Sequence, residues 1–189
     1  MDLTPDFLSL IADIYDAALD SAHWPEVARK LGDLFQCGIA VFTQHKTSPA
    51  PIILATFGFA EKYLHSFREY YAGVSPWMPH LVAQPAGSVV RGEDIVAADD
   101  FEQSEFYNDW LKPQGFYHGI GGILSNNDNE ISKVAMLRPP QIGILSAMET
   151  AQFRSLTVHL QRAASVHRQL AIAHLQRDFG LRGRLEIGD

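Results

Sequence analysis

The chain contains no proline or glycine between Ser146 and Gly180, and this uninterrupted run constrains the fold more than any other feature of the sequence. It predicts one helix of about thirty residues, because proline and glycine are the residues that most often end a helix. Ser146 and Glu149 have the spacing of a capping box at its start. Residues on one face then recur at alternating steps of three and four, which is a heptad seam. The seam residues are Phe153, Leu156, Leu160, Ala163, His167 and Leu170. A seam of this length predicts a homodimer, since an unpartnered apolar stripe would face water.

Before this helix, helical and strand patterns alternate along the chain. Helical spacing of apolar residues is found at residues 4–19, 25–35, 60–73 and 104–111. Strand patterns are found at residues 38–45, 51–58, 88–92, 117–124 and 131–138. Hairpins rather than crossover units connect the strands, which makes the sheet antiparallel. We therefore predict an α+β fold with a five-stranded antiparallel sheet. Helices cover both of its faces, or one face and one end, and the long helix follows.

The length of 189 residues predicts a single domain with its own core. We assign residues 1–178 to this domain and residues 179–189 to a flexible tail or the start of a linker. The single cysteine, Cys37, excludes an internal disulfide and any zinc site built from several cysteines. The N-terminus is acidic where a secretory signal is basic, and no apolar run is long enough to span a membrane, so we expect a cytoplasmic protein.

Charge is unevenly distributed along the chain. The first 149 residues hold 19 acidic and 9 basic side chains, whereas the remainder holds 3 acidic and 6 basic ones. An acidic body repels phosphate groups. We therefore expect no nucleic-acid binding by this chain alone.

The stretch 104–124 combines large aromatic rings with several glycines. At helical spacing its first part presents one wide aromatic face that includes Phe106 and Trp110. In the strand that follows, Gly119 and Gly121 leave one side nearly bare, and glycine within a strand usually marks something that lies close to the backbone. Either the rings of Phe106 and Trp110 fill this hollow as a closed core, or the hollow is part of a ligand pocket.

A second aromatic cluster, in "YYAGVSPW" at residues 70–77, flanks a proline-rich loop. This segment resembles the "YY…DPW" motif of the N-terminal sensor domains of LuxR-type transcriptional regulators, the group that includes acyl-homoserine-lactone receptors. The residues "FYNDW…GFYHG" at 106–119 resemble a second aromatic motif of these domains, and the similarity spans about residues 14–170. The resemblance implies a PAS/GAF-like fold that holds a small ligand between sheet and helices, dimerises, and controls a C-terminal helix-turn-helix module.

Two departures from this family affect the expected function. The quorum receptors use the aspartate of Asp-Pro to accept the amide hydrogen of the ligand, and Ser75 takes that position here. A homoserine lactone is therefore not the expected ligand. The residues after the long helix are too few for a helix-turn-helix module. We expect either a fragment of a longer regulator or a stand-alone domain derived from one.

Candidate ligand contacts come from both aromatic clusters and from nearby polar groups. They are Tyr70, Tyr71, Ser75, Trp77, Phe106, Tyr107, Trp110 and His118. No lysine or arginine lies between Arg68 and Arg91, so an anionic ligand would lack a fixed positive partner in this region. We expect a mostly apolar, neutral ligand.

Motifs for catalysis, cofactors and metals are weak. No Ser, Cys or Lys stands at a recognisable spacing from a base, and the glycines at 119–122 lie within a strand rather than before a helix. His159, His167 and His174 are too far apart along a helix to share a metal ion. We predict no enzyme, no cofactor and no metal.

Three classes of function remain open. A binding module predicts a pocket above about 300 Å³. An enzyme predicts titratable groups that converge in that pocket. A dimerisation scaffold predicts no pocket.

Overall fold

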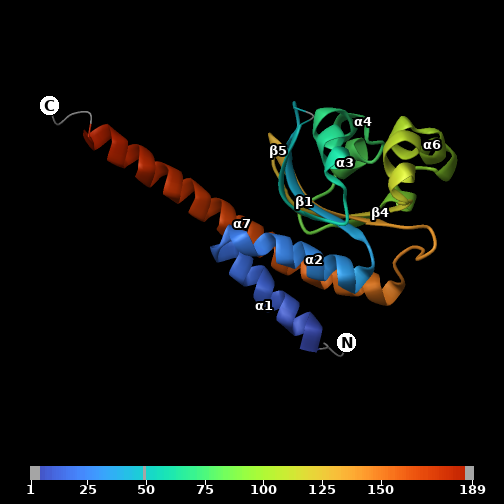
Figure 1. The fold of residues 1–189 in the computed structure, drawn as a ribbon, viewed down its shortest axis with the longest axis horizontal. Coiled ribbons are helices and arrows are strands. Elements are labelled where there is room, and N and C mark those ends of the chain that lie inside the picture. The colour runs from blue at the N-terminus through green and yellow to red at the C-terminus, as the bar shows by residue number, and fades with distance from the viewer. Residues whose placement is uncertain (1–4, 49, 186–189) are drawn as a thin grey trace.

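Five β-strands form one antiparallel sheet in the computed structural model, which describes residues 5–48 and 50–185 (Figure 1). The strands are β1 (Gly38–His45), β2 (Pro51–Phe57), β3 (Val89–Arg91), β4 (His118–Asn126) and β5 (Glu130–Arg138). Their order across the sheet is β2-β1-β5-β4-β3, and every neighbouring pair is antiparallel. The predicted α+β class and five-stranded antiparallel sheet are confirmed.

Asn127 closes the hairpin between β4 and β5. Its Oδ1 accepts hydrogen bonds from the backbone N–H groups of Asn129 (2.9 Å) and Glu130 (3.0 Å). Asparagine suits this position because its side chain can bond the backbone two residues further on. The register of the hairpin places Lys133 of β5 opposite Ile123 of β4.

Three helices lie on one side of the sheet, which we call the first face; two of them pack directly on the strands, and the N-terminal one packs on the outer side of those two (Figure 1). They are α1 (Pro5–Leu19), α2 (Trp24–Phe35) and α7 (Ala147–Leu185), and the turn η1 (Ser21–His23) joins the first two. The main core lies between these helices and the sheet, where Trp24 and Phe153 are both 0 % exposed. Burial of such large apolar side chains provides most of the stabilisation of a fold of this kind.

The predicted capping box begins α7. Ser146 N donates to Glu149 Oε2 (2.8 Å), and Glu149 N donates to Ser146 Oγ (3.2 Å). Glu149 also accepts a hydrogen bond from Arg138 Nη2 at the end of β5 (2.6 Å), and Arg138 Nε donates to the main-chain oxygen of Phe35 (2.7 Å). The start of α7 is thereby tied to both the sheet and α2.

The heptad seam of α7 faces the core of its own chain. Phe153, Leu156, Leu160 and Ala163 are each 0 % exposed within a single chain, and α1 packs along α7. The prediction that these four residues form dimer contacts is therefore wrong, because α1 and the sheet occupy the place of a second copy. A heptad pattern indicates that a helix has a partner, but it does not say which chain provides that partner.

The remaining seam residues, His167 and Leu170, lie further along α7 and are half-buried. The ring of His167 packs edge-on against Trp24, with 6.2 Å between centroids. Beyond this point α7 projects away from the body of the protein (Figure 1). It continues to Leu185, so the predicted domain boundary at residue 178 falls within the helix. Residues 186–189 lie outside the described residues.

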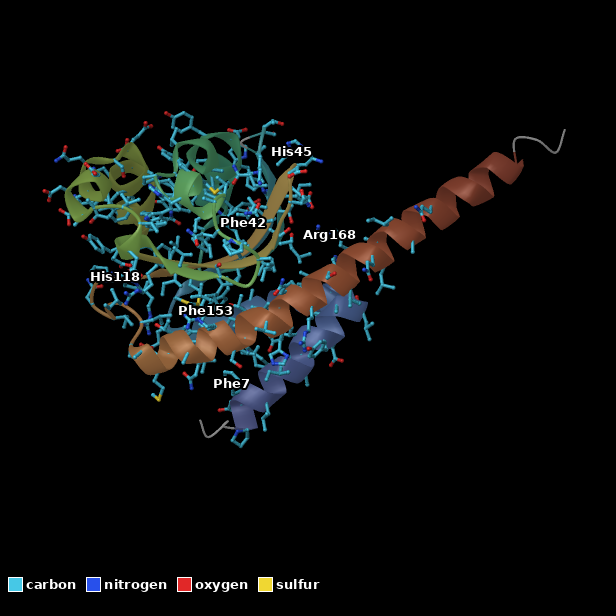
Figure 2. The ribbon with its side chains drawn as sticks, turned by 180° about the vertical axis from the view of Figure 1, so that it is seen from behind. Phe7, Phe42, His45, His118, Phe153 and Arg168 are labelled. Atoms are coloured by element: carbon cyan, nitrogen blue, oxygen red, sulfur yellow. The ribbon has the colours of Figure 1, made fainter. Side chains whose placement is uncertain are left out.

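Arg168 ties α7 to the β4–β5 hairpin close to the point where the helix leaves the body (Figure 2). Its Nη1 donates to Glu130 Oε1 (2.8 Å), and its Nη2 donates to Ser125 Oγ (2.9 Å) and Ser132 Oγ (3.1 Å). One guanidinium therefore holds both strands of the hairpin, which its planar fork of donors suits.

The other side of the sheet, the second face, carries short helices (Figure 1). They are α3 (Glu61–Ser66), η2 (Phe67–Tyr71), α4 (Ala72–Val74), α5 (Met78–Leu81), η3 (Gly92–Asp94), α6 (Ala98–Gln103), η4 (Phe106–Leu111) and η5 (Lys112–Gln114). The segments η2 and η4 are π-helical, so their turns are wider than those of an α-helix. The sheet thus has helices on both faces, which is the first of the two predicted arrangements.

Candidate ligand-binding site

The bare side of β4 is covered by side chains from the proline-rich loop. The ring of Trp77 lies against Gly119, and the side chain of Leu81 lies against Gly121. A β-carbon at position 119 would overlap the Trp77 ring, which explains why this strand position is glycine. The expectation that rings from the segment 104–111 fill this hollow is therefore wrong.

Aromatic rings pack into a continuous cluster above Trp77. Trp77 stacks on Phe101 of α6 with 5.1 Å between centroids, and it meets Phe106 of η4 edge-on at 5.6 Å. Trp110 stacks on Phe67 of η2 at 4.9 Å and lies 5.2 Å from Phe106. Offset stacks and edge-on contacts are the favoured geometries of aromatic pairs. The rings of Phe106 and Trp110 therefore pack on other aromatic rings rather than on the strand glycines.

Both aromatic helical segments are π-helical where the sequence predicted an ordinary helix. Trp110 Nε1 donates a hydrogen bond to the main-chain oxygen of Tyr63 (2.9 Å), one turn before η2 begins. A side chain that enters the hydrogen-bond ladder of a helix is a known cause of local distortion. The buried indole of Trp110 thereby joins η4 to the helix that leads into η2.

An apolar cavity of ≈ 60 Å³ lies between this cluster and the sheet. Its wall includes Phe42, Phe67, Ser75, Trp77, Phe106, Trp110 and Lys133. A space of this size holds a few water molecules. It is smaller than the about 300 Å³ expected of a pocket for an organic ligand. Such a ligand therefore requires the helices of the second face to move away from the sheet.

The predicted ligand contacts divide into two groups. Those in the cavity wall are Ser75, Trp77, Phe106 and Trp110. Those outside the wall are Tyr70, Tyr71, Tyr107 and His118. The structure thus brings together residues from the loop and from η4, and the role of these residues in binding stays a prediction.

Two of the residues outside the wall have polar partners at the surface. Tyr70 donates a hydrogen bond from its hydroxyl group to Glu105 Oε2 (3.0 Å). His118 Nδ1 lies 2.6 Å from Glu93 Oε1. The alternation of β4 that turns Gly119 toward the cavity turns His118 away from it.

The cavity wall contains a cation that the sequence argument missed. Lys133 is only 5 % exposed, its Nζ contacts Met78 Sδ, and the ammonium lies 4.9 Å from the centroid of the Phe42 ring. Burial lowers the pKa of Lys133 to about 7. The expectation of a neutral ligand rested on the absence of a cation from this region, and that premise is wrong.

The alternation of side chains along β5 indicates from the sequence that Lys133 lies on a buried face. Ile131, Ala135 and Leu137 share its face of the strand, and Ile131 and Leu137 are buried. A lysine among them is therefore placed on an apolar face. Lys133 lies far from the aromatic loop in the sequence, but the fold of the sheet brings β5 next to this loop in space.

A surface groove of ≈ 330 Å³ adjoins the cavity. Ser75 lines both spaces, while Met78 lines the groove and contacts Lys133 Nζ. The opposite side of the groove is formed by residues 44–48 at the end of β1. Ser75 and Met78 therefore stand between the groove and the ammonium group.

Among the described residues of the cavity wall, only Lys133 has a titratable side chain. No group of three or more His, Cys, Asp or Glu side chains within residues 5–48 and 50–185 is arranged to hold a metal ion. The helices in this part of the chain include none that is both long enough and apolar enough to cross a membrane.

No protein-family model matches the sequence, and a comparison with curated proteins gives no match. Solved structures do share its fold. The LBD domain of VqsR from Pseudomonas aeruginosa matches with a TM-score of 0.70 and 14 % identity, covering 88 % of this chain and 98 % of that one. The N-acylhomoserine lactone dependent LuxR family transcription factor CepR2 from Burkholderia cenocepacia matches with a TM-score of 0.61 and 17 % identity, covering 88 % and 98 %.

A GAF domain from a phosphoenolpyruvate-protein phosphotransferase of Coxiella burnetii also matches, with a TM-score of 0.57 and 11 % identity over 88 % of this chain and 97 % of that one. At these identities the likeness concerns architecture. The chain has the GAF/PAS-like fold of the ligand-binding domains of LuxR-type regulators.

Proposed function

We propose that this chain is the small-molecule-sensing domain of a LuxR-type transcriptional regulator and acts in the cytoplasm. The observation that carries this proposal is the apolar cavity between the sheet and the second-face helices, in a fold shared with the VqsR LBD domain and CepR2. The wall is mostly aromatic and aliphatic, with Ser75 and Lys133 as polar groups. Sites for small organic molecules commonly have this composition.

Ligand binding requires the cavity to enlarge from ≈ 60 Å³. The elements on its outer side are short: α5 spans Met78–Leu81, and η2 and η4 are single π-helical segments. Short elements open locally at a lower free-energy cost than a central sheet or a long packed helix. We infer that the second-face helices separate from the sheet and then close around the ligand.

The proposal is tested by native mass spectrometry of protein purified from its own host. We expect a retained small molecule in the wild type and in Tyr70→Ala, and its loss in Trp110→Ala. Tyr70 is a matched control because it is an aromatic residue near the same cluster that is 48 % exposed and lies outside the cavity wall. Phe106→Leu is a second cavity variant with a smaller loss of packing. A retained molecule that stays bound in both cavity variants would contradict this site.

We further propose that the projecting part of α7 forms a homodimer. Ile172 is 49 % exposed on this part of the helix, and Val166, just before it, is 38 % exposed. A pair of helices would bury such side chains. In a complete regulator this helix would lead toward the helix-turn-helix module. The acidic body described here, with 19 acidic and 9 basic side chains in its first 149 residues, is not expected to bind DNA.

The second candidate is an interaction scaffold without a ligand, and the small volume of the closed cavity favours it. For a scaffold, Trp110→Ala changes stability alone, and no small molecule is retained by the wild type. Catalysis is not proposed, because Lys133 is the one titratable side chain among the described residues of the wall.

A further inference from the structure

We propose that the cavity binds an apolar organic acid whose carboxylate pairs with the ammonium group of Lys133. This inference rests on the proposed sensing function and specifies the class of ligand. Lys133 lies on β5, the middle strand of the sheet, and its side chain forms part of the cavity wall. A carboxylate that enters the cavity would meet this group on the floor formed by the sheet.

Lys133 is buried without a carboxylate partner among the described residues. It is 5 % exposed, and none of the ion pairs found in this part of the chain includes it. Its ammonium contacts the Met78 sulfur and lies over the Phe42 ring. A thioether is a weak acceptor, and an ammonium has three donors to satisfy. The site therefore has unused capacity for an anion.

The groups that face Lys133 come from three elements. They are Phe42 of β1 and Ile123 of β4, which are paired with Lys133 across the sheet, and Met78 of α5. None of these side chains is titratable. No charge on the facing elements therefore compensates the buried ammonium.

The charged and titratable groups of these elements point elsewhere. Glu130 and Arg138 of β5 form ion pairs on the first face of the sheet, because they have the opposite parity to the buried lysine. His45 of β1 and His80 of α5 are exposed. His118 of β4 pairs with a surface glutamate.

Desolvation alone lowers the pKa of Lys133 to about 7. The ammonium group of the ligand-free protein therefore loses its proton much more readily than that of an exposed lysine. A carboxylate beside Nζ stabilises the charged form and raises the pKa again. Binding of an organic acid therefore takes up a proton near neutral pH, and its affinity falls as the pH rises above 7. A neutral ligand lacks this fall in affinity.

The groove beside the cavity provides a route to Lys133. Met78 lines this groove and contacts the ammonium, and Ser75 lines both the groove and the cavity. An acid that enters here replaces the weak sulfur contact with a charge-assisted hydrogen bond, which is about twice as strong as a neutral one. The hydroxyl of Ser75 lies on the same route and offers a second polar contact.

The experiment compares straight-chain fatty acids of six to twelve carbons, benzoate and phenylacetate with the primary amide of each. Binding to the whole chain is measured by thermal shift and isothermal titration, in wild type, Lys133→Met and Lys133→Gln. Lys112→Met is the matched control, because Lys112 also lies over an aromatic ring but is exposed outside the cavity. Native mass spectrometry of protein from its own host is run beside the titrations.

We expect acids to bind wild type and the Lys112 variant at least tenfold more tightly than their amides, and to lose at least tenfold in affinity for both Lys133 variants. Above pH 7 the affinity of wild type for the acid falls by up to about tenfold per pH unit, while that for the amide does not fall. Titrations in two buffers of different ionisation enthalpy measure the proton uptake.

If amides bind wild type as tightly as acids, or if both folded Lys133 variants keep their affinity for acids, the acid-binding inference fails and the sensing function stands. If no probe of either kind binds and no molecule is retained from the host, both proposals fail.

Discussion

The indole ring of Trp77 lies directly on the backbone of β4 at Gly119, in the space where any other residue would place its β-carbon. The same ring stacks on Phe101, so the glycine sets the position of the aromatic cluster relative to the sheet. The two strand glycines thus differ in packing, because the nearest atoms to a β-carbon at Gly121 would be those at the flexible end of Leu81.

Gly119→Ala is expected to destabilise the protein by about 1–3 kcal/mol, because the Trp77 ring must move away from the strand. Gly121→Ala is the matched control. Its β-carbon would lie 3.3 Å from Leu81 Cδ2, which can rotate away, so its stability should change by less than about 1 kcal/mol. Urea unfolding followed by tryptophan fluorescence measures both variants. A loss of stability in Gly119→Ala as small as that in Gly121→Ala would mean that the Trp77 ring moves at little cost in free energy.

Trp110→Phe separates the hydrogen bond of Trp110 from its packing. Phenylalanine retains an aromatic ring but cannot donate to the Tyr63 main-chain oxygen, so we expect a loss of about 1 kcal/mol. Trp110→Ala also removes the stacked contacts and should cost about 3–5 kcal/mol. Chemical unfolding measures the free energy of unfolding of both variants and so separates the hydrogen bond from the packing. A phenylalanine variant as unstable as the alanine variant would show that the hydrogen bond dominates.

Lys133→Met is expected to stabilise the ligand-free protein at pH 7, because it removes a buried amine without a carboxylate partner. The pKa of Lys133 is lowered from 10.5 to about 7, so the unfolded chain binds the proton more tightly between these values. The free energy of unfolding of the wild type therefore rises with pH between these two values. Lys133 alone contributes a rise of about 1.4 kcal/mol per pH unit. The advantage of the methionine variant should shrink accordingly from pH 7 to pH 9 in urea unfolding. A constant difference between the proteins would contradict the lowered pKa.

Leu160→Asp should unfold the chain rather than only separate a dimer. Leu160 is 0 % exposed, and a buried carboxylate at this position costs at least about 3 kcal/mol. Leu170→Asp, on the projecting part of α7, should leave the melting temperature nearly unchanged and shift a dimer to monomer in analytical ultracentrifugation at tens of micromolar. Gln169→Asp is its exposed control. A wild-type protein that is monomeric at this concentration would contradict the proposed dimer.

Cys37 should be inert in the folded protein. It is 8 % exposed, and burial raises the pKa of its thiol to about 12. Because the thiolate is the reactive form, a disulfide reagent at pH 8 should react at the rate of unfolding rather than at the rate of a free thiol. The reaction should become fast in concentrated urea. Fast labelling of the native protein would indicate that the region around Cys37 opens on its own.

The elements of this fold were predictable because each has a local period. The hairpin β4–β5, the long α7 and its Ser146–Glu149 capping box all follow from residues close together in the sequence. The partner of α7 was not predictable in the same way. Leu160 follows a heptad pattern that a second chain or α1 satisfies equally well, and only the packing of the whole chain selects α1.

The candidate site was predicted in part for the same reason. Trp77, Phe106 and Trp110 were identified because aromatic residues cluster in the sequence, and all three reach the cavity wall. Lys133 lies far from them in the sequence and joins them only through the pairing of β5 with its neighbours. The hydrogen bond from Trp110 to the main-chain oxygen of Tyr63, beside the π-helical turns, likewise joins segments that are distant in the sequence.

Ser132 and Lys133 are consecutive residues of β5, so one points toward Arg168 of α7 and the other toward the cavity. A displacement of the backbone at Lys133 would therefore also move Ser132, the hydrogen-bond partner of Arg168. From Arg168 to Leu185 the helix extends roughly 25 Å at 1.5 Å per residue. Over this length a tilt of about 5° at Arg168 would move the far end of α7 by about 2 Å. The length of α7 would therefore turn a small rotation at the sheet into a larger displacement at the end of the helix.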